Sequence, residues 1–134
     1  KENWDKPFSG SGKRIIKSHT FSHKLDELKT LGYPIVIVYR SHLECFDWWI
    51  QAGGFDITYP DYSYFGTNNE MKTHILKQNR DITKFIQQNI GNIECPIDNI
   101  DLCRVLKIKS PDPKLRIHNY AQRDTKVYVY RSHE

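Results

Sequence analysis

The stretch KRIIKSHTFSHKLDELKTLGYPIVIVYRSHLE, residues 13–44, decides the fold that we expect for this chain. It contains two short apolar runs, at 14–16 and 34–39, and each run ends in polar side chains. Lys17 and His19 follow the first run, and Arg40 follows the second. An ordinary strand end has no need of such groups, so the stretch indicates chemistry at the strand ends.

The second apolar run predicts a central strand. It begins at a proline, is almost wholly β-branched and is followed by a helix start, which is typical of a strand covered on both faces in a parallel sheet. We therefore expect the side chains of Ile35, Val36, Ile37 and Val38 all to be buried.

Helices are predicted after both strands. One is expected from about Ser22 to Leu31, with Ser22 as its cap and Gly32 at its end. Ser41 and Glu44 form a capping box, which starts a second helix that runs toward the two glycines at 53–54. Strand, helix, strand, helix in this order predicts neighbouring parallel strands, hence an α/β fold with a parallel sheet flanked by helices.

The rest of the chain predicts one long helix and then less regular structure. The aromatic stretch at 53–66 is expected to be an ordered loop, and a capping box at Thr67 opens a long helix that ends before Gly91. In the less regular C-terminal third we expect strands at Leu102–Ile108 and Thr125–Arg131. Residues 1–134 are interpreted as a single α/β domain, or a fragment of one, because this length buries one core.

Composition restricts the classes of protein. No apolar run approaches the ~20 residues that cross a bilayer, so no membrane partner is expected. Three cysteines without close pairing favour reduced thiols and a cytoplasmic location. His19 and His23 stand one helical turn apart, but without close cysteine pairs no metal site is predicted. The net charge of +4 permits a polyanionic partner without requiring one.

The two predicted strand ends give the candidate site. In an open parallel sheet, ligands lie beyond the carboxyl ends of the strands, where a helix start presents free N–H groups to an anion. Arg40 and Ser41 lie at such an end and predict a phosphate or sulfate site. Lys17 and His19 suit group transfer there, with His19 as general base and Lys17 stabilising charge on the transferred group.

The segments KRIIKSHTF and YPIVIVYR resemble the central part of the P-loop sulfotransferase family, over roughly residues 13–49. The resemblance implies that 3'-phosphoadenosine 5'-phosphosulfate is the cofactor and that a hydroxyl group accepts the sulfuryl. It also implies roles for three residues. His19 would be the catalytic base, Lys17 the lysine that assists transfer, and Arg40 the arginine that binds the 3'-phosphate.

The family's 5'-phosphosulfate loop is missing from this sequence, and two hypotheses therefore stay open. In one, the chain is a sulfotransferase-like protein, or a piece of one, that binds a 3'-phosphorylated adenine nucleotide and transfers sulfuryl if a phosphate-binding segment precedes Lys1. In the other, the chain is a non-catalytic basic and aromatic binding or assembly module that contacts nucleic acid or another protein.

Overall fold

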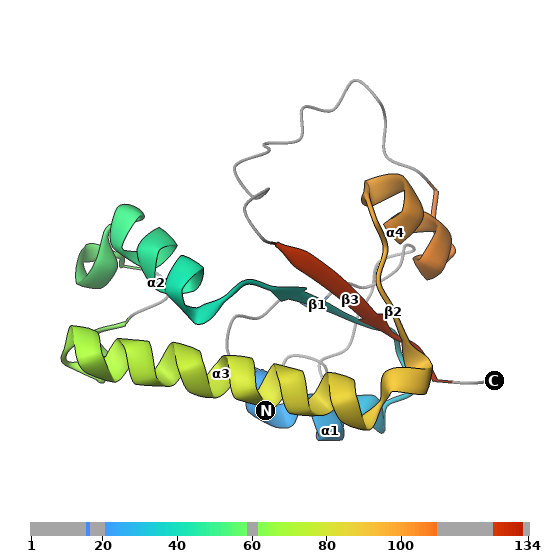
Figure 1. The fold of residues 1–134 in the computed structure, drawn as a ribbon, viewed down its shortest axis with the longest axis horizontal. Coiled ribbons are helices and arrows are strands. Elements are labelled where there is room, and N and C mark those ends of the chain that lie inside the picture. Colours follow the sequence, from blue (N-terminus) through green and yellow to red (C-terminus); the bar gives the residue numbers. More distant parts are fainter. Residues whose placement is uncertain (1–15, 17–20, 59–61, 110–124, 133–134) are drawn as a thin grey trace, which may run out of the picture.

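The computed structural model describes Ile16 and residues 21–58, 62–109 and 125–132. Short helical turns alternate in it with four α-helices and three strands (Figure 1). In chain order the elements are η2 (Ser22–Lys24), α1 (Leu25–Lys29), β1 (Ile35–Tyr39), α2 (His42–Gln51), η3 (Gly54–Asp56), η4 (Ser63–Phe65), α3 (Asn68–Gln88), η5 (Ile90–Asn92), β2 (Ile93–Glu94), α4 (Asn99–Leu106) and β3 (Lys126–Tyr130).

The described strands form one antiparallel sheet in the order β1-β3-β2. Ile35 pairs with Tyr130 and Tyr39 with Lys126, while the short strand β2 pairs with the other side of β3 through Ile93 and Tyr130. The predicted α/β fold with a parallel sheet is therefore wrong, and the fold is not that of a P-loop protein. The strand expected at 14–17, on which the parallel pairing depended, lies outside the described residues apart from Ile16.

Among the described strands β1 lies at the edge of the sheet, and one of its faces is exposed, so the predictions of a central strand and of four buried side chains are also wrong. Ile37 is buried, but Val36 is 41% exposed and Val38 62% exposed. Side chains alternate between the two faces of a strand, and only the face that carries Ile37 is covered along the strand. A β-branched run reflects β propensity in edge and central strands alike, and the sequence therefore did not distinguish the two.

Two hydrophobic clusters hold the helices in place. In the first, one face of the sheet packs on α1 and α3 through Leu25, Ile37, Phe85 and Tyr130. The second lies between α2 and α3, where Trp49 contacts Met71 and Ile75. Figure 1 shows α3 running along one side of the sheet, with α4 on the other side of β2 and β3.

The aromatic stretch packs as an ordered segment where the structure describes it. The ring of Trp49 lies 4.8 Å from that of Phe55 and 5.9 Å from that of Tyr62. The ring of Phe65 lies 4.2 Å from the imidazole of His74 on α3. These contacts join the segment to both α2 and α3, as the prediction of a packed loop required.

The local helix signals gave mixed results. Ser41 and Thr67 accept hydrogen bonds from the N–H groups of Glu44 and Glu70, so both predicted caps are confirmed. Ser22 is not a cap, because it lies within η2. The N-cap of that turn is the residue that precedes Ser22. The expected strand at Leu102–Ile108 is wrong: α4 covers most of it and starts at Asp98, whose carboxylate accepts from the N–H of Asp101. The strand expected at Thr125–Arg131 is confirmed as β3.

The helices also bear on the expectation that the chain has no membrane partner. Within the described part of the chain, no helix has both the length and the apolar composition needed to cross a lipid bilayer.

Candidate functional site

A groove with a volume of about 270 Å³ lies where the end of β1 and the start of α2 meet α3. Two of its lining residues, Tyr39 and His42, come from the chain segment that contains the predicted site. The others project from α3. The α2–α3 groove is lined by Tyr39, His42, Leu76, Asn79, Arg80, Thr83, Lys84 and Gln87.

The charges of the α2–α3 groove have one sign. Arg80 and Lys84 stand four residues apart on α3, so they lie on one face of that helix, and His42 adds an imidazole from α2. Among the described lining residues there is no carboxylate to neutralise them. A groove lined by cationic side chains and by no anion attracts an anionic ligand.

The N-terminus of α2 adds to this positive character. Ser41 accepts a hydrogen bond from the N–H of Glu44 through its Oγ atom, at 3.2 Å, and this fixes the helix start. His42 is the first residue of α2 and lines the groove. The first N–H groups of a helix have no acceptor within it and carry the positive end of its dipole. The helix start therefore favours an anion in the α2–α3 groove.

Arg40 is at the strand end that the sequence predicted, but its guanidinium does not line the groove. The Nε atom donates to the hydroxyl of Thr125 at 2.8 Å, and the guanidinium carbon lies 5.4 Å from the centre of the Trp48 ring. The Arg40 side chain thus connects the end of β1 to the segment that starts β3. Its proposed contact with a 3'-phosphate stays a prediction.

The backbone of Arg40 positions the groove. Asn79 on α3 is 8% exposed, and its Nδ2 group donates to the carbonyl oxygen of Arg40 at 2.7 Å. The same oxygen accepts from the thiol of Cys45 at 3.6 Å. Burial raises the pKa of that thiol, and so keeps it in the protonated form that donates. These bonds hold the strand end, and hence Tyr39 and His42, against α3.

The structure brings together only part of the predicted site. Arg40 and Ser41 are adjacent to the groove, whereas Lys17 and His19 lie outside the described residues. All four residues were expected at one crevice because the strands were predicted to be parallel, and the described sheet is antiparallel.

Arg80 and Lys84 were not among the residues predicted for the site. Their spacing of four residues on a predicted helix was a usable signal for one cationic face. Nothing in the sequence indicated that this face meets the end of β1. That depends on the contact between Asn79 and Arg40, which are far apart along the chain.

No metal centre is indicated by the described residues. Nowhere among them do three or more histidine, cysteine or acidic side chains gather in a way that would hold a metal ion. His23 and the three free cysteines thus form no such group within the described ranges.

Comparisons with protein-family models, curated protein sequences and solved structures find no match to this chain. The resemblance to sulfotransferases consequently rests only on the two sequence segments.

Proposed function

We propose that the chain binds a nucleotide through its phosphate group in the α2–α3 groove. The observation that carries this proposal is the convergence of Arg80 and Lys84 with the N-terminus of α2, in a groove whose described lining has no carboxylate. Guanidinium and ammonium groups form charge-assisted hydrogen bonds to phosphate, and helix N-termini favour the same group. Ser41 supports the site by fixing the helix start.

The aromatic wall of the groove suits the remainder of a nucleotide. Tyr39 lines the groove, and its ring is held edge-on against Tyr128 at a centroid distance of 6.4 Å. A tyrosine ring of this kind offers a surface on which a base stacks, and stacking is tolerant of base identity. A 3'-phosphorylated adenine nucleotide, the ligand class implied by the sequence resemblance, has both a phosphate and a base.

The proposal covers binding and not group transfer. Transfer of sulfuryl to a hydroxyl acceptor depends on Lys17 and His19, which lie outside the described residues. We also propose a cytoplasmic location, because Cys45, Cys95 and Cys103 are all free and free thiols persist in a reducing compartment.

Calorimetric titration of the chain with 3'-phosphoadenosine 5'-phosphate tests the proposal, with adenosine as the ligand that lacks phosphate. Arg80→Gln should weaken nucleotide binding roughly tenfold to a hundredfold, since it removes a charge-assisted hydrogen bond. Lys77→Gln removes the same charge from α3 at an exposed residue that does not line the groove, so it should leave affinity within about twofold.

Two results would overturn the proposal. One is the absence of detectable heat at millimolar nucleotide. The other is an equal loss of affinity in Arg80→Gln and Lys77→Gln, which would indicate attraction by overall charge. If a single-stranded oligonucleotide binds and the mononucleotide does not, the chain is a nucleic-acid module instead.

A further inference from the structure

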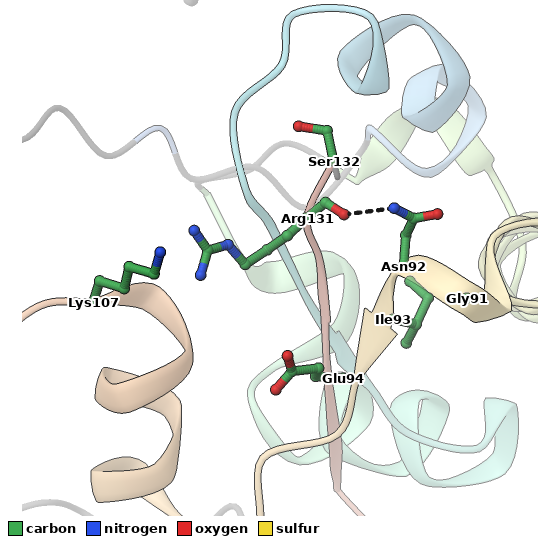
Figure 2. A pocket seen from close by; sticks show the side chains of 7 residues that line it. All are labelled: Gly91, Asn92, Ile93, Glu94, Lys107, Arg131 and Ser132. Atoms are coloured by element: carbon green, nitrogen blue, oxygen red, sulfur yellow. Dashed lines mark hydrogen bonds between the residues drawn. The ribbon is translucent and has the colours of Figure 1, made fainter. Parts of the chain in front are cut away.

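A second pocket with two cationic side chains, with a volume of about 280 Å³, lies where the end of α4 meets β2 and the residues that follow β3. In Figure 2 the side chains of Lys107 and Arg131 extend toward one another from α4 and β3, and Glu94 stands nearby on β2. The α4–β3 pocket is lined by Gly91, Asn92, Ile93, Glu94, Lys107, Arg131 and Ser132.

Arg131 is held in place by three hydrogen bonds. Its Nη1 group donates to the carbonyl oxygen of Val105 at 2.7 Å. Its backbone N–H donates to the carbonyl oxygen of Asn92 at 3.0 Å. The Asn92 Nδ2 group donates to the Arg131 carbonyl oxygen at 2.9 Å, as the dashed line in Figure 2 shows. A guanidinium fixed through one Nη atom keeps its other N–H groups for a ligand and loses little freedom on binding.

Lys107 occupies a backbone position that favours glycine. The N–H of Ile108 donates to the carbonyl of Cys103, and the N–H of Lys107 to that of Arg104, which is the Schellman arrangement at a helix end. Lys107 is left-handed there, with φ 56° and ψ 45°. Among the described residues it is the only one other than glycine with a positive φ.

A lysine at this position costs stability that glycine would not. Closing the helix requires the backbone hydrogen bonds but not an ammonium group. Strained residues of this kind cluster at ligand sites, and here the lysine side chain lines a pocket beside a fixed arginine. The strain thus indicates that the side chain itself has a use.

The surroundings favour a singly charged anion over a phosphate. Glu94 lines the same pocket, and the carbonyl groups at the C-terminal end of α4 form the negative end of its dipole. These negative groups oppose a second charge on the ligand. A carboxylate has one charge, and its two oxygens match the paired N–H groups of a guanidinium.

We propose that the α4–β3 pocket binds the carboxylate group of a small molecule between the ammonium of Lys107 and the guanidinium of Arg131. This site is distinct from the α2–α3 groove and takes a different ligand class. It does not depend on the proposed nucleotide binding.

Titration of the 134-residue chain with sodium acetate, followed by amide signals in two-dimensional NMR, tests this site. Sodium chloride and sodium phosphate at matched ionic strength are the other two arms. Acetate should move the signals of Lys107, Arg131 and Ser132 along a saturating curve, chloride should not, and phosphate should bind more weakly than acetate.

The decisive variant is Lys107→Gly, which separates binding from folding. It should weaken acetate binding about tenfold or more, because a charge-assisted hydrogen bond is lost. It should also raise the melting temperature by about 2 to 5 °C, because the strain is relieved. Lys109→Gln removes an exposed charge outside the pocket and should keep affinity within about twofold.

Several outcomes would overturn the assignment. Unchanged acetate affinity in Lys107→Gly excludes the ammonium as a ligand group. A lower melting temperature in that variant shows that the lysine stabilises the fold and is not strained for a ligand. Saturation by chloride, or tighter binding of phosphate than of acetate, excludes a carboxylate site.

Discussion

The same residues, Tyr-Arg-Ser-His, occur in the sequence at 39–42 and at 130–133, and the tyrosine, arginine and serine of the two copies have different surroundings at the ends of β1 and β3. In both places the carbonyl oxygen of the arginine accepts from an asparagine Nδ2 group, from Asn79 for Arg40 and from Asn92 for Arg131. After β1 the serine caps a helix, and the arginine side chain turns to Trp48 and Thr125. After β3 the arginine itself lines a pocket at the end of another helix.

A short motif therefore does not define a site by itself. The α2–α3 groove lies at a helix N-terminus and takes its cations from α3, whereas the α4–β3 pocket lies at a helix C-terminus beside Glu94. Opposite helix ends have opposite partial charges. Similar cationic side chains are accordingly expected to select a phosphate in one place and a carboxylate in the other.

The largest expected difference is in how the two asparagines support their strand ends. Asn79→Ala should lower the free energy of unfolding by ~1 to 3 kcal/mol, because it removes the buried amide donor and leaves the Arg40 carbonyl only the weaker thiol donor of Cys45. Asn92→Ala removes the equivalent bond, but Asn92 is only half-buried and water can replace it. Its cost should therefore be smaller. Urea unfolding followed by tryptophan fluorescence measures both.

Equal losses in the two variants would contradict this comparison, because burial would then not decide the cost of the bond. A change in the slope of the urea transition would show that a variant had altered the unfolded or native state more broadly.

A smaller effect is expected at the helix cap. Ser41→Ala should lower the free energy of unfolding by ~1 kcal/mol and also weaken binding of 3'-phosphoadenosine 5'-phosphate, because Ser41 fixes the helix start beside the groove. Thr67→Ala is the matched control. It removes a cap with the same 3.2 Å hydrogen bond from a helix start that does not line the groove.

Thr67→Ala should cost similar stability and leave nucleotide affinity unchanged. If both variants weaken the nucleotide equally, loss of stability explains the effect and the α2 N-terminus has no part in binding. Calorimetry at a temperature where both variants are folded makes this distinction.

The two capping boxes were the reliable local signals in the sequence, whereas the cap predicted at Ser22 was wrong. Ser41 with Glu44 and Thr67 with Glu70 predicted both helix starts, because a cap depends on residues three apart along the chain. The start of α4 has a similar signal in Asp98 with Asp101. Its apolar residues were nevertheless interpreted as a strand, because a short apolar run does not separate helix from strand.

Partner choice could not be predicted from the same signals. The run at Ile35–Tyr39 pairs with Lys126–Tyr130, near the other end of the chain, and no local pattern specifies that partner or its antiparallel direction. The exposure of Val36 and Val38 was not predictable either, because it depends on which face of the strand the helices cover. The groove likewise depends on a contact between distant residues, since Arg80 and Lys84 become a site only when α3 meets the end of β1.

The smallest expected effect is a difference in how the two regions respond to acid. Burial, then Lys77 and His23, lowers the pKa of His74 below its ordinary 6.5, and the His74 ring stacks on Phe65 beside α2 and α3. The unfolded chain then binds the proton more readily, so this region should lose stability as pH falls below about 6.5.

The pKa of Asp101 is instead lowered below 3.8, by the N–H of Ile97 and then by Arg104. Because an acid with a lowered pKa stabilises the fold above its unfolded pKa, α4 should keep this contribution until pH falls below 3.8.

Amide hydrogen exchange between pH 6.5 and 4, corrected for the intrinsic rate, should therefore show faster opening at α3 next to His74 and little change at α4. His74→Phe keeps a ring against Phe65 but removes the titrating group, and it should abolish this difference. Faster exchange at both regions together would show that the acid response belongs to the whole fold and not to His74.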